Sequence, residues 1–275
     1  MKTRTLTSIV ITIIMGLFFY LRTYSVKYFD LLVAILAIIA SIEVTSVFKD
    51  RITKFQKIAA IIFPITLVLV ASFAKGFLLS HIFAYISVII IASIFGVNDN
   101  KTENISSCLF VLFYPAVPFM FISLVNNMGV ISTFALVTVF ASSWLTDIFA
   151  YVVGITVKGK KLCERISPNK TISGSIGGVI GGIVATLLTY FIFKYLKVNP
   201  FAGASELSLI IFLIVTGVFF SIVTQVGDLF ESFIKRGFGV KDFSSLLPGH
   251  GGITDRCDGL IFNSMAVYII YSFLI

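Results

Sequence analysis

The chain has 275 residues, of which 58% are hydrophobic and 12% charged, and its mean hydropathy is +1.05. Soluble domains contain about 45–50% apolar and about 25% charged residues, so the composition excludes an ordinary water-soluble enzyme, a disordered chain and a collagen-like chain. The 21 Lys and Arg outnumber the 13 Asp and Glu. Because these cations lie in short gaps between apolar runs, we interpret them as signals that set the topology of a membrane protein. The expected partner is therefore the lipid bilayer, and we expect no binding of nucleic acid.

Nine apolar runs are candidates for membrane-spanning helices. A helix needs about 20 apolar residues to cross a bilayer, and these runs lack the alternation of β-barrel strands. The sequence therefore predicts an all-α polytopic membrane protein with about nine transmembrane helices. The runs cover residues 6–21, 28–48, 56–74, 78–96, 105–124, 130–153, 174–197, 206–230 and 258–275.

The basic residues predict the orientation. Nine spans put the two termini on opposite sides of the membrane, and most Lys and Arg then fall on the side of the N-terminus. Cytoplasmic loops carry such an excess, so we expect a cytoplasmic N-terminus in the cell inner membrane. The first run ends without a small-residue cleavage pattern, and we expect it to remain as a membrane anchor.

The two halves of the chain differ in their polar content. Residues 1–125 hold few polar groups and are interpreted as a transmembrane scaffold. Residues 126–275 contain two charged, glycine-bearing loops on the predicted cytoplasmic side, 154–173 and 231–257, and are interpreted as the catalytic region. The three cysteines show no C-x-x-C spacing, so we predict neither a disulfide framework nor a zinc site.

Among the acidic residues inside or at the ends of apolar runs, four are candidates for a role in the membrane. Acids in a membrane span are costly and generally face a cavity or a partner. Asp147, Asp228 and Glu231 lie toward the cytoplasmic ends of their spans and are candidates for a site. Glu43 has few polar neighbours in the sequence, and its simplest interpretation is pairing with a neighbouring helix or with Lys49.

Residues 241–258 combine glycines, acids and cations. The glycines beside His250 allow backbone N–H groups to line a phosphate. Asp255 and Asp258 share a face at the start of the last helix, and with Asp228 they can hold Mg²⁺ through hard oxygen ligands. Nearby Lys and Arg can neutralise phosphate charge. The segment therefore indicates metal-assisted phosphoryl or nucleotidyl transfer.

The same stretch resembles a family signature. Ser232–Asp258 is similar to the signature of the phosphatidate cytidylyltransferases, also called CDP-diacylglycerol synthases. Only Cys257 departs, at a position where the family usually has an aliphatic residue. The matching residues are Ser232, Ile234, Lys235, Arg236, Lys241, Asp242, Ser244, Leu247, Pro248, His250, Gly251, Gly252, Ile253, Asp255, Arg256 and Asp258.

Two upstream segments match the same family. The first resembles its Asp-x-x-Ala-Tyr-x-x-Gly segment and the second its Ser-Pro-x-Lys-Thr-x-x-Gly-x-x-Gly-Gly segment. The resemblance covers residues 140–275; before that only the hydropathy agrees. The matching residues are Asp147, Ala150, Tyr151 and Gly154, then Ser167, Pro168, Lys170, Thr171, Gly174, Gly177 and Gly178.

The resemblance implies that CTP and phosphatidate give CDP-diacylglycerol and pyrophosphate, with Mg²⁺ as one or two ions and the active site facing the cytoplasm. The implied metal ligands are Asp228 and Asp255, followed by Asp258. The other catalytic candidates are Lys235, Arg236, Lys241, Asp242, His250 and Arg256. The substrate-binding candidates are Asp147, Tyr151, Ser167, Lys170, Thr171, Gly174, Ser232, Gly251 and Gly252.

Alternatives stay open at several positions. Glycines 174–182 have the spacing of close helix packing, and glycine-rich helices are also compatible with a homodimer. Ser167-Pro168 fits a helix start as well, and His250 can fix its loop instead of carrying a proton. For the whole chain, the alternatives are a CTP-dependent lipid kinase of the polyprenol type, a secondary transporter with acids near the midplane, and a lipid scaffold without turnover.

Overall fold

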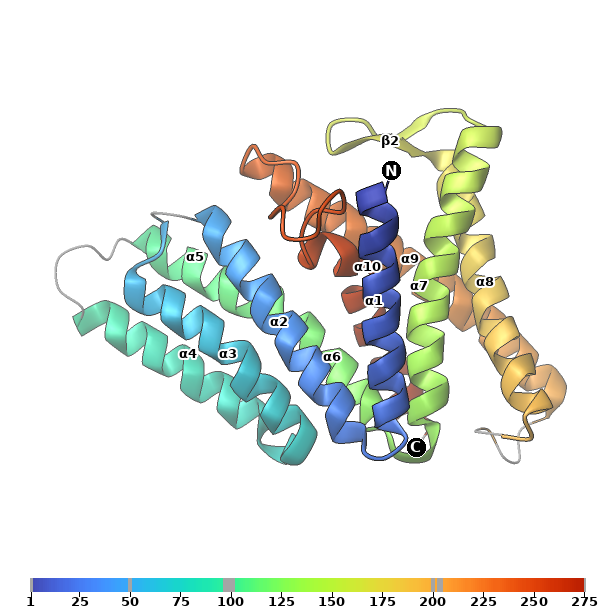
Figure 1. The fold of residues 1–275 in the computed structure, drawn as a ribbon, viewed down its shortest axis with the longest axis horizontal. Coiled ribbons are helices and arrows are strands. Elements are labelled where there is room, and N and C mark those ends of the chain that lie inside the picture. Colours follow the sequence, from blue (N-terminus) through green and yellow to red (C-terminus); the bar gives the residue numbers. More distant parts are fainter. Residues whose placement is uncertain (1, 49–50, 96–101, 199–200, 202–204, 275) are drawn as a thin grey trace. The chain divides into compact units, whose positions relative to one another are not determined.

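The computed structural model describes residues 2–48, 51–95, 102–198, 201 and 205–274, and it is almost entirely helical (Figure 1). This confirms the predicted all-α fold, to which the structure adds one small hairpin. The elements are α1 (Lys2–Arg22), α2 (Val26–Phe48), α3 (Lys54–Phe73), η2 (Lys75–Phe77), α4 (Leu78–Phe95), α5 (Thr102–Phe113), α6 (Ala116–Asn126), η3 (Gly129–Ile131), α7 (Ser132–Thr156), β1 (Lys161–Cys163), β2 (Ser167–Thr171), α8 (Ile172–Tyr195), α9 (Glu206–Gly237) and α10 (Thr254–Ser272).

Eight segments of the described chain are long and apolar enough to cross a membrane. The predicted run 105–124 is divided between α5 and α6 by a break at Tyr114 and Pro115. The α9 helix continues to Gly237, beyond the predicted end of its run. A helix, α10, does occupy the ninth predicted run, but it is not among those eight segments. The total of nine spans and the cytoplasmic N-terminus therefore stay predictions.

The chain folds into two compact units. Unit 1 contains Met1–Asn127 together with Asp242–Arg256, and unit 2 contains Met128–Lys241 together with Cys257–Ile275. The first boundary lies close to the predicted division after residue 125. Residues 242–253 of the loop before α10, which the sequence places in the C-terminal region, belong to unit 1. The α10 helix thus begins in unit 1 and continues in unit 2.

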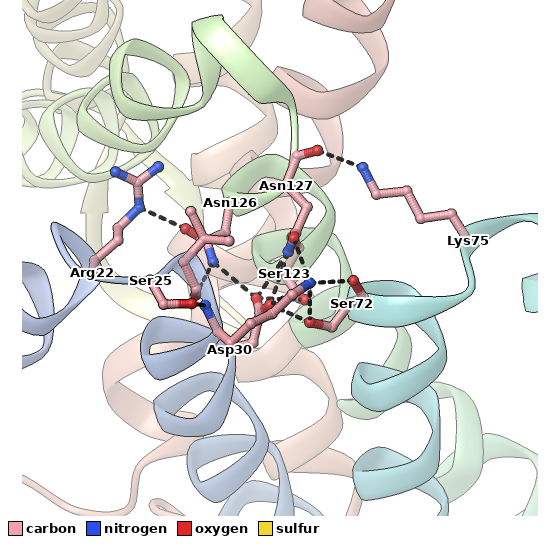
Figure 2. Close-up of polar contacts among 10 residues, drawn as sticks. Arg22, Ser25, Asp30, Ser72, Lys75, Ser123, Asn126 and Asn127 are labelled. Atoms are coloured by element: carbon pink, nitrogen blue, oxygen red, sulfur yellow. Dashed lines mark hydrogen bonds and ion pairs between the residues drawn. The ribbon is translucent and has the colours of Figure 1, made fainter.

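Unit 1 is built on contacts among α2, α3 and α6, and a buried acid links these helices at one end (Figure 2). Asp30 of α2 is only 4% exposed. Its carboxylate accepts hydrogen bonds from Ser123 Oγ at 2.7 Å, Asn126 Nδ2 at 2.9 Å and Asn127 Nδ2 at 2.9 Å, and one from the Ser72 hydroxyl. These donors compensate a charge that would otherwise be very costly to bury.

Three cations contact this cluster, and Figure 2 labels two of them, Arg22 and Lys75. Lys27 Nζ donates to the side chains of Ser72 and Asn127 at 2.9 and 3.0 Å. Arg22 Nε donates to Asn126 Oδ1 at 2.6 Å, and Lys75 donates to the Asn127 backbone carbonyl. Because the residues involved come from α1, α2, α3, η2 and α6, the cluster connects helices at one end of unit 1.

Unit 2 depends on the close approach of α8 to α7 and α9. A Cβ added at Gly182 would lie 2.5 Å from the Gly217 carbonyl oxygen, and one at Gly177 would lie 2.6 Å from Val153 Cβ. At Gly181 the obstacle would be the Leu145 carbonyl. The helix-packing interpretation of these α8 glycines is therefore confirmed. Because they pack inside the chain, they supply no argument for a homodimer.

We expect Asp30→Asn to destabilise the protein. The substitution replaces one carboxylate oxygen, an acceptor, with an NH₂ group that faces the donors around Asp30. The expected loss of stability is about 2 kcal/mol, which lowers the midpoint temperature of unfolding by roughly 5 °C for a chain of this size. Thermal unfolding in detergent measures the shift. Glu206→Gln is the control, because that side chain is 56% exposed and its ion pair contributes little. An Asp30→Asn midpoint equal to that of the wild type would contradict this role for Asp30.

Candidate functional site

A cavity of about 650 Å³ lies in unit 2, where α7, α8 and α9 meet the β1–β2 hairpin. Ligand pockets have volumes of roughly 300–1,000 Å³, so this cavity is large enough for a substrate. Predicted site residues from α7, from the hairpin with the start of α8, and from α9 line this cavity together, although up to 81 positions separate them in the chain. The predicted site residues in its lining are Asp147, Tyr151, Lys170, Thr171, Gly174 and Asp228.

Three acids of unit 2 lie near one another. Asp228 of α9 forms an ion pair with Lys170 of β2, and the two side chains are 29% and 26% exposed. The Asp228 carboxylate is also close enough to Asp147 of α7 and Asp258 of α10 for their negative charges to repel. A bound cation would relieve this repulsion.

The chemistry of this acidic group fits Mg²⁺, which prefers hard oxygen ligands. Within the described ranges, however, no three His, Cys, Asp or Glu side chains are already arranged to hold a metal ion. Asp258 Oδ1 accepts the Gly259 N–H at 2.7 Å, and Asp228 is paired with Lys170. The structure thus brings Asp228 and Asp258 together and adds Asp147, whereas metal binding stays a prediction.

The hairpin that carries Lys170 forms through a turn after α7. Lys158 and Gly159 adopt positive φ angles of 57° and 114°, a conformation that glycine tolerates well and that reverses the chain. The Ser173 hydroxyl donates to the Lys158 carbonyl, and β1 then pairs antiparallel with β2. This local geometry delivers Lys170 to Asp228.

Ser167 and Thr171 begin and end β2. The alternative that Ser167-Pro168 starts a helix is wrong, because α8 begins only at Ile172. Thr171 is the N-cap of α8 and accepts the Gly174 N–H at 3.1 Å, which is the usual role of Thr at that position. Contact of Ser167 or Thr171 with a substrate stays a prediction.

The end of α9 carries the predicted polar stripe. Glu231 is fully buried and pairs with Lys235 at 2.8 Å, so lysine compensates the acid one helical turn away. Arg236 donates through Nε to the Ile166 carbonyl at 3.4 Å and through Nη1 to the Val240 carbonyl at 3.2 Å. Arg236 therefore links α9 to the backbone just before β2 and to the loop that follows the helix.

The part of the signature that belongs to unit 1, Asp242–Arg256, is called the signature loop below, and it contains a tight turn. The Leu247 N–H donates to the Gly251 carbonyl and the His250 N–H donates to the Leu247 carbonyl, both at 2.8 Å. Gly249 and Gly251 have φ angles of 76° and 83°, which side chains other than glycine rarely adopt. The glycine pattern around His250 therefore serves backbone reversal.

His250 and Arg256 hold this turn against its surroundings. His250 Nε2 lies 3.2 Å from Ser8 Oγ of α1, and Arg256 Nε donates to the His250 carbonyl at 2.6 Å. These contacts favour the loop-fixing interpretation of His250. Its function as a proton carrier is untested.

Asp255 is buried in the first turn of α10 and also holds the signature loop. Its Oδ2 accepts the backbone N–H of Gly252 at 2.8 Å and that of Phe243 at 3.0 Å. Two backbone donors compensate the loss of water around this buried carboxylate. Asp255 belongs to unit 1, and its predicted place beside Asp228 stays a prediction.

The predicted site residues divide between the two units. Those in unit 2 are Asp147, Tyr151, Ser167, Lys170, Thr171, Gly174, Asp228, Ser232, Lys235, Arg236, Lys241 and Asp258. Those in unit 1 are Asp242, His250, Gly251, Gly252, Asp255 and Arg256.

The structure adds polar groups that the sequence analysis did not select. Lys158, Lys161, Asn169 and Gln225 line the cavity of unit 2. Gln225 precedes Asp228 by three residues, which places both on one helix face; this spacing was the signal that could have identified it. The two lysines lie in the predicted charged loop 154–173.

Comparison with known proteins gives a family and several relatives. The model of the cytidylyltransferase family matches residues 2–274. A phosphatidate cytidylyltransferase of Brucella abortus is 40% identical over 159 residues, which are 58% of this chain and 54% of the relative. That of Aquifex aeolicus is 35% identical over 161 residues, covering 58% and 55%. That of Staphylococcus saprophyticus is 29% identical over 275 residues, covering 95% of each.

The match spans about half the length of the Brucella and Aquifex relatives and nearly the full length of the Staphylococcus relative. The eight apolar helical segments of the described chain and the relatives together identify an integral membrane protein. The family-model match extends through both units, so the resemblance seen in residues 140–275 holds for the whole chain. The chain belongs to the cytidylyltransferase family.

Proposed function

We propose that the protein is a phosphatidate cytidylyltransferase that converts CTP and phosphatidate to CDP-diacylglycerol and pyrophosphate. The observation that carries this proposal is the cavity of unit 2. It unites Asp147 and Lys170, from the two upstream segments of the family pattern, with Asp228, an acid that precedes the signature by four residues. The names of the curated relatives support the same activity.

The chemistry requires two polyanions to approach each other. An oxygen of the lipid phosphate attacks the α-phosphorus of CTP, the bond from that phosphorus to the β-phosphate oxygen breaks, and pyrophosphate leaves. The attacking phosphate is already anionic, so no strong general base is needed. Lys158, Lys161 and Lys170 line the cavity and can neutralise phosphate charge and orient the reactants.

We propose Mg²⁺ as the cofactor, one or two ions held by Asp228, Asp255 and Asp258 with Asp147 nearby. When bound, the metal supplies charge neutralisation at the phosphate oxygens. The protein's own part is to supply these carboxylates, of which Asp228 and Asp258 lie near each other in unit 2. Lys170 balances Asp228 before the substrate arrives and can donate to a phosphate afterwards.

The proposed location is the cell inner membrane, with the cavity facing the cytoplasm. CTP is water-soluble and phosphatidate stays in the bilayer, so the site must reach both. The cavity lies at the end of α7 beside the lysine-rich hairpin, on the predicted cytoplasmic side. Tyr151 and Ile155 in its lining are 68% and 51% exposed, which suits contact with lipid.

We expect Lys170→Met to lower kcat/KM for cytidylyl transfer by roughly 100-fold, the scale of losing one charged donor at a reacting phosphate. Turnover of purified protein in mixed micelles is the measurement. Lys194→Met is a matched control, because Lys194 also forms a Lys–carboxylate pair in unit 2, an exposed pair with Glu206. Equal activity of the two variants would contradict the role of Lys170.

We expect label from α-labelled CTP to enter the lipid, and label from γ-labelled CTP to leave as pyrophosphate. This follows from attack at the α-phosphorus. The measurement uses purified protein in detergent with phosphatidate and Mg²⁺. Entry of γ-label into phosphatidate or an added polyprenol would instead identify a lipid kinase and overturn the proposal.

A further inference from the structure

Glu43 of α2 is buried, with 4% exposure, and its carboxylate accepts four hydrogen bonds from one segment. Oε1 accepts from Ser244 Oγ at 2.7 Å and from the Ile253 N–H at 2.9 Å. Oε2 accepts from the Thr254 N–H at 2.9 Å and from Thr254 Oγ1 at 2.8 Å. Glu43 and its three partner residues all belong to unit 1.

The sequence predicts that Glu43 pairs with a neighbouring helix or with Lys49. Glu43 does pair with another helix, since Thr254 is the first residue of α10. The suggested partner Lys49 lies outside the described residues, and the partners recorded for Glu43 are neutral hydroxyl and backbone groups. Two of them are backbone N–H groups at the start of α10. Such groups have no acceptor within their own helix, and negative charge near them is favoured by the helix dipole. Glu43 thus caps α10 from a helix about 200 positions away.

Gly252 supplies an independent link between Glu43 and the signature loop. A Cβ at this position would lie 2.5 Å from both carboxylate oxygens of Glu43. The carboxylate is held by four hydrogen bonds and cannot move aside without losing some of them. The absence of a side chain at Gly252 is therefore a requirement of the Glu43 contact.

Asp255 also accepts a hydrogen bond from this turn. It accepts the Gly252 N–H, while Glu43 accepts the next two N–H groups, those of Ile253 and Thr254. Three consecutive N–H groups are therefore shared between two carboxylates. Displacing Glu43 would leave the Ile253 and Thr254 N–H groups without this acceptor. The backbone that orients Asp255 would then be held less firmly.

We propose that Glu43 is a positioning residue that orients the Asp255 carboxylate by holding the start of α10. The inference rests on the proposed function, in which Asp255 is a metal ligand. Residues that support metal ligands in this way commonly change metal affinity by about 10- to 100-fold when mutated. Glu43 itself acts through the loop and touches no substrate in this scheme.

The test uses Glu43→Gln in the full-length protein, with two measurements. Hydrogen–deuterium exchange of peptides covering residues 244–258 is expected to accelerate about tenfold. The reason is that the glutamine NH₂ group faces N–H and hydroxyl donors that lose a carboxylate acceptor. The Mg²⁺ concentration for half-maximal turnover is expected to rise about tenfold, while KM for CTP changes little. Gly252→Ala is expected to reproduce both effects.

Asp30→Asn is the matched control, because Asp30 is the other buried carboxylate of α2. It is expected to lower thermal stability without changing exchange in residues 244–258 or Mg²⁺ dependence. If Glu43→Gln does not fold, Ser244→Ala removes one of the four hydrogen bonds and is expected to shift both readouts in the same direction, by less.

Unchanged exchange in a folded Glu43→Gln protein would overturn the proposal. Faster exchange with unchanged Mg²⁺ dependence would also overturn it, leaving Glu43 a structural cap alone. Absence of cytidylyl transfer in the wild type would instead refute the proposed function, and the exchange measurement would still decide whether Glu43 holds the loop.

Discussion

Burial of carboxylates away from water is the constraint on which the rest of this structure depends. A carboxylate that leaves water needs hydrogen bonds or a cation to compensate its charge. Asp30 and Glu43 of unit 1 meet this need chiefly with hydroxyl, amide and backbone donors from other segments. Glu231 of unit 2 meets it with Lys235. The two solutions in unit 1 tie distant parts of the chain together, whereas the Glu231–Lys235 pair is local to α9.

The acids around the cavity of unit 2 are arranged differently. Asp147, Asp228 and Asp258 repel one another, and Lys170 pairs with Asp228, both side chains being partly exposed. Like charges held near one another are costly in a structural core but useful where a cation and phosphates are to bind. This mutual repulsion distinguishes the acids around the cavity from Asp30, Glu43 and Glu231.

Small residues make that arrangement of acids possible. The Cβ positions of Gly174 and Gly178 on α8 would fall 2.7 Å from the Ala150 carbonyl and 2.9 Å from Gln225 Nε2. A larger side chain at Gly174 would push α8 away from α7, the helix that carries Asp147. Gly174 therefore packs against α7 and lines the cavity at the same time, although the sequence offers these two roles as alternatives.

The membrane class, the helical fold and the family pattern could be predicted from the amino-acid sequence, because apolar run length, charge placement and motif spacing are local properties. The sequence also selected most of the acids and Lys170 that meet in unit 2. Tertiary structure decided the β1–β2 hairpin, the assignment of Asp242–Arg256 to unit 1 and the partners of Glu43. Those features depend on hydrogen bonds and packing between residues far apart in the chain, and no local pattern around Glu43 specifies which distant backbone N–H groups its carboxylate will accept.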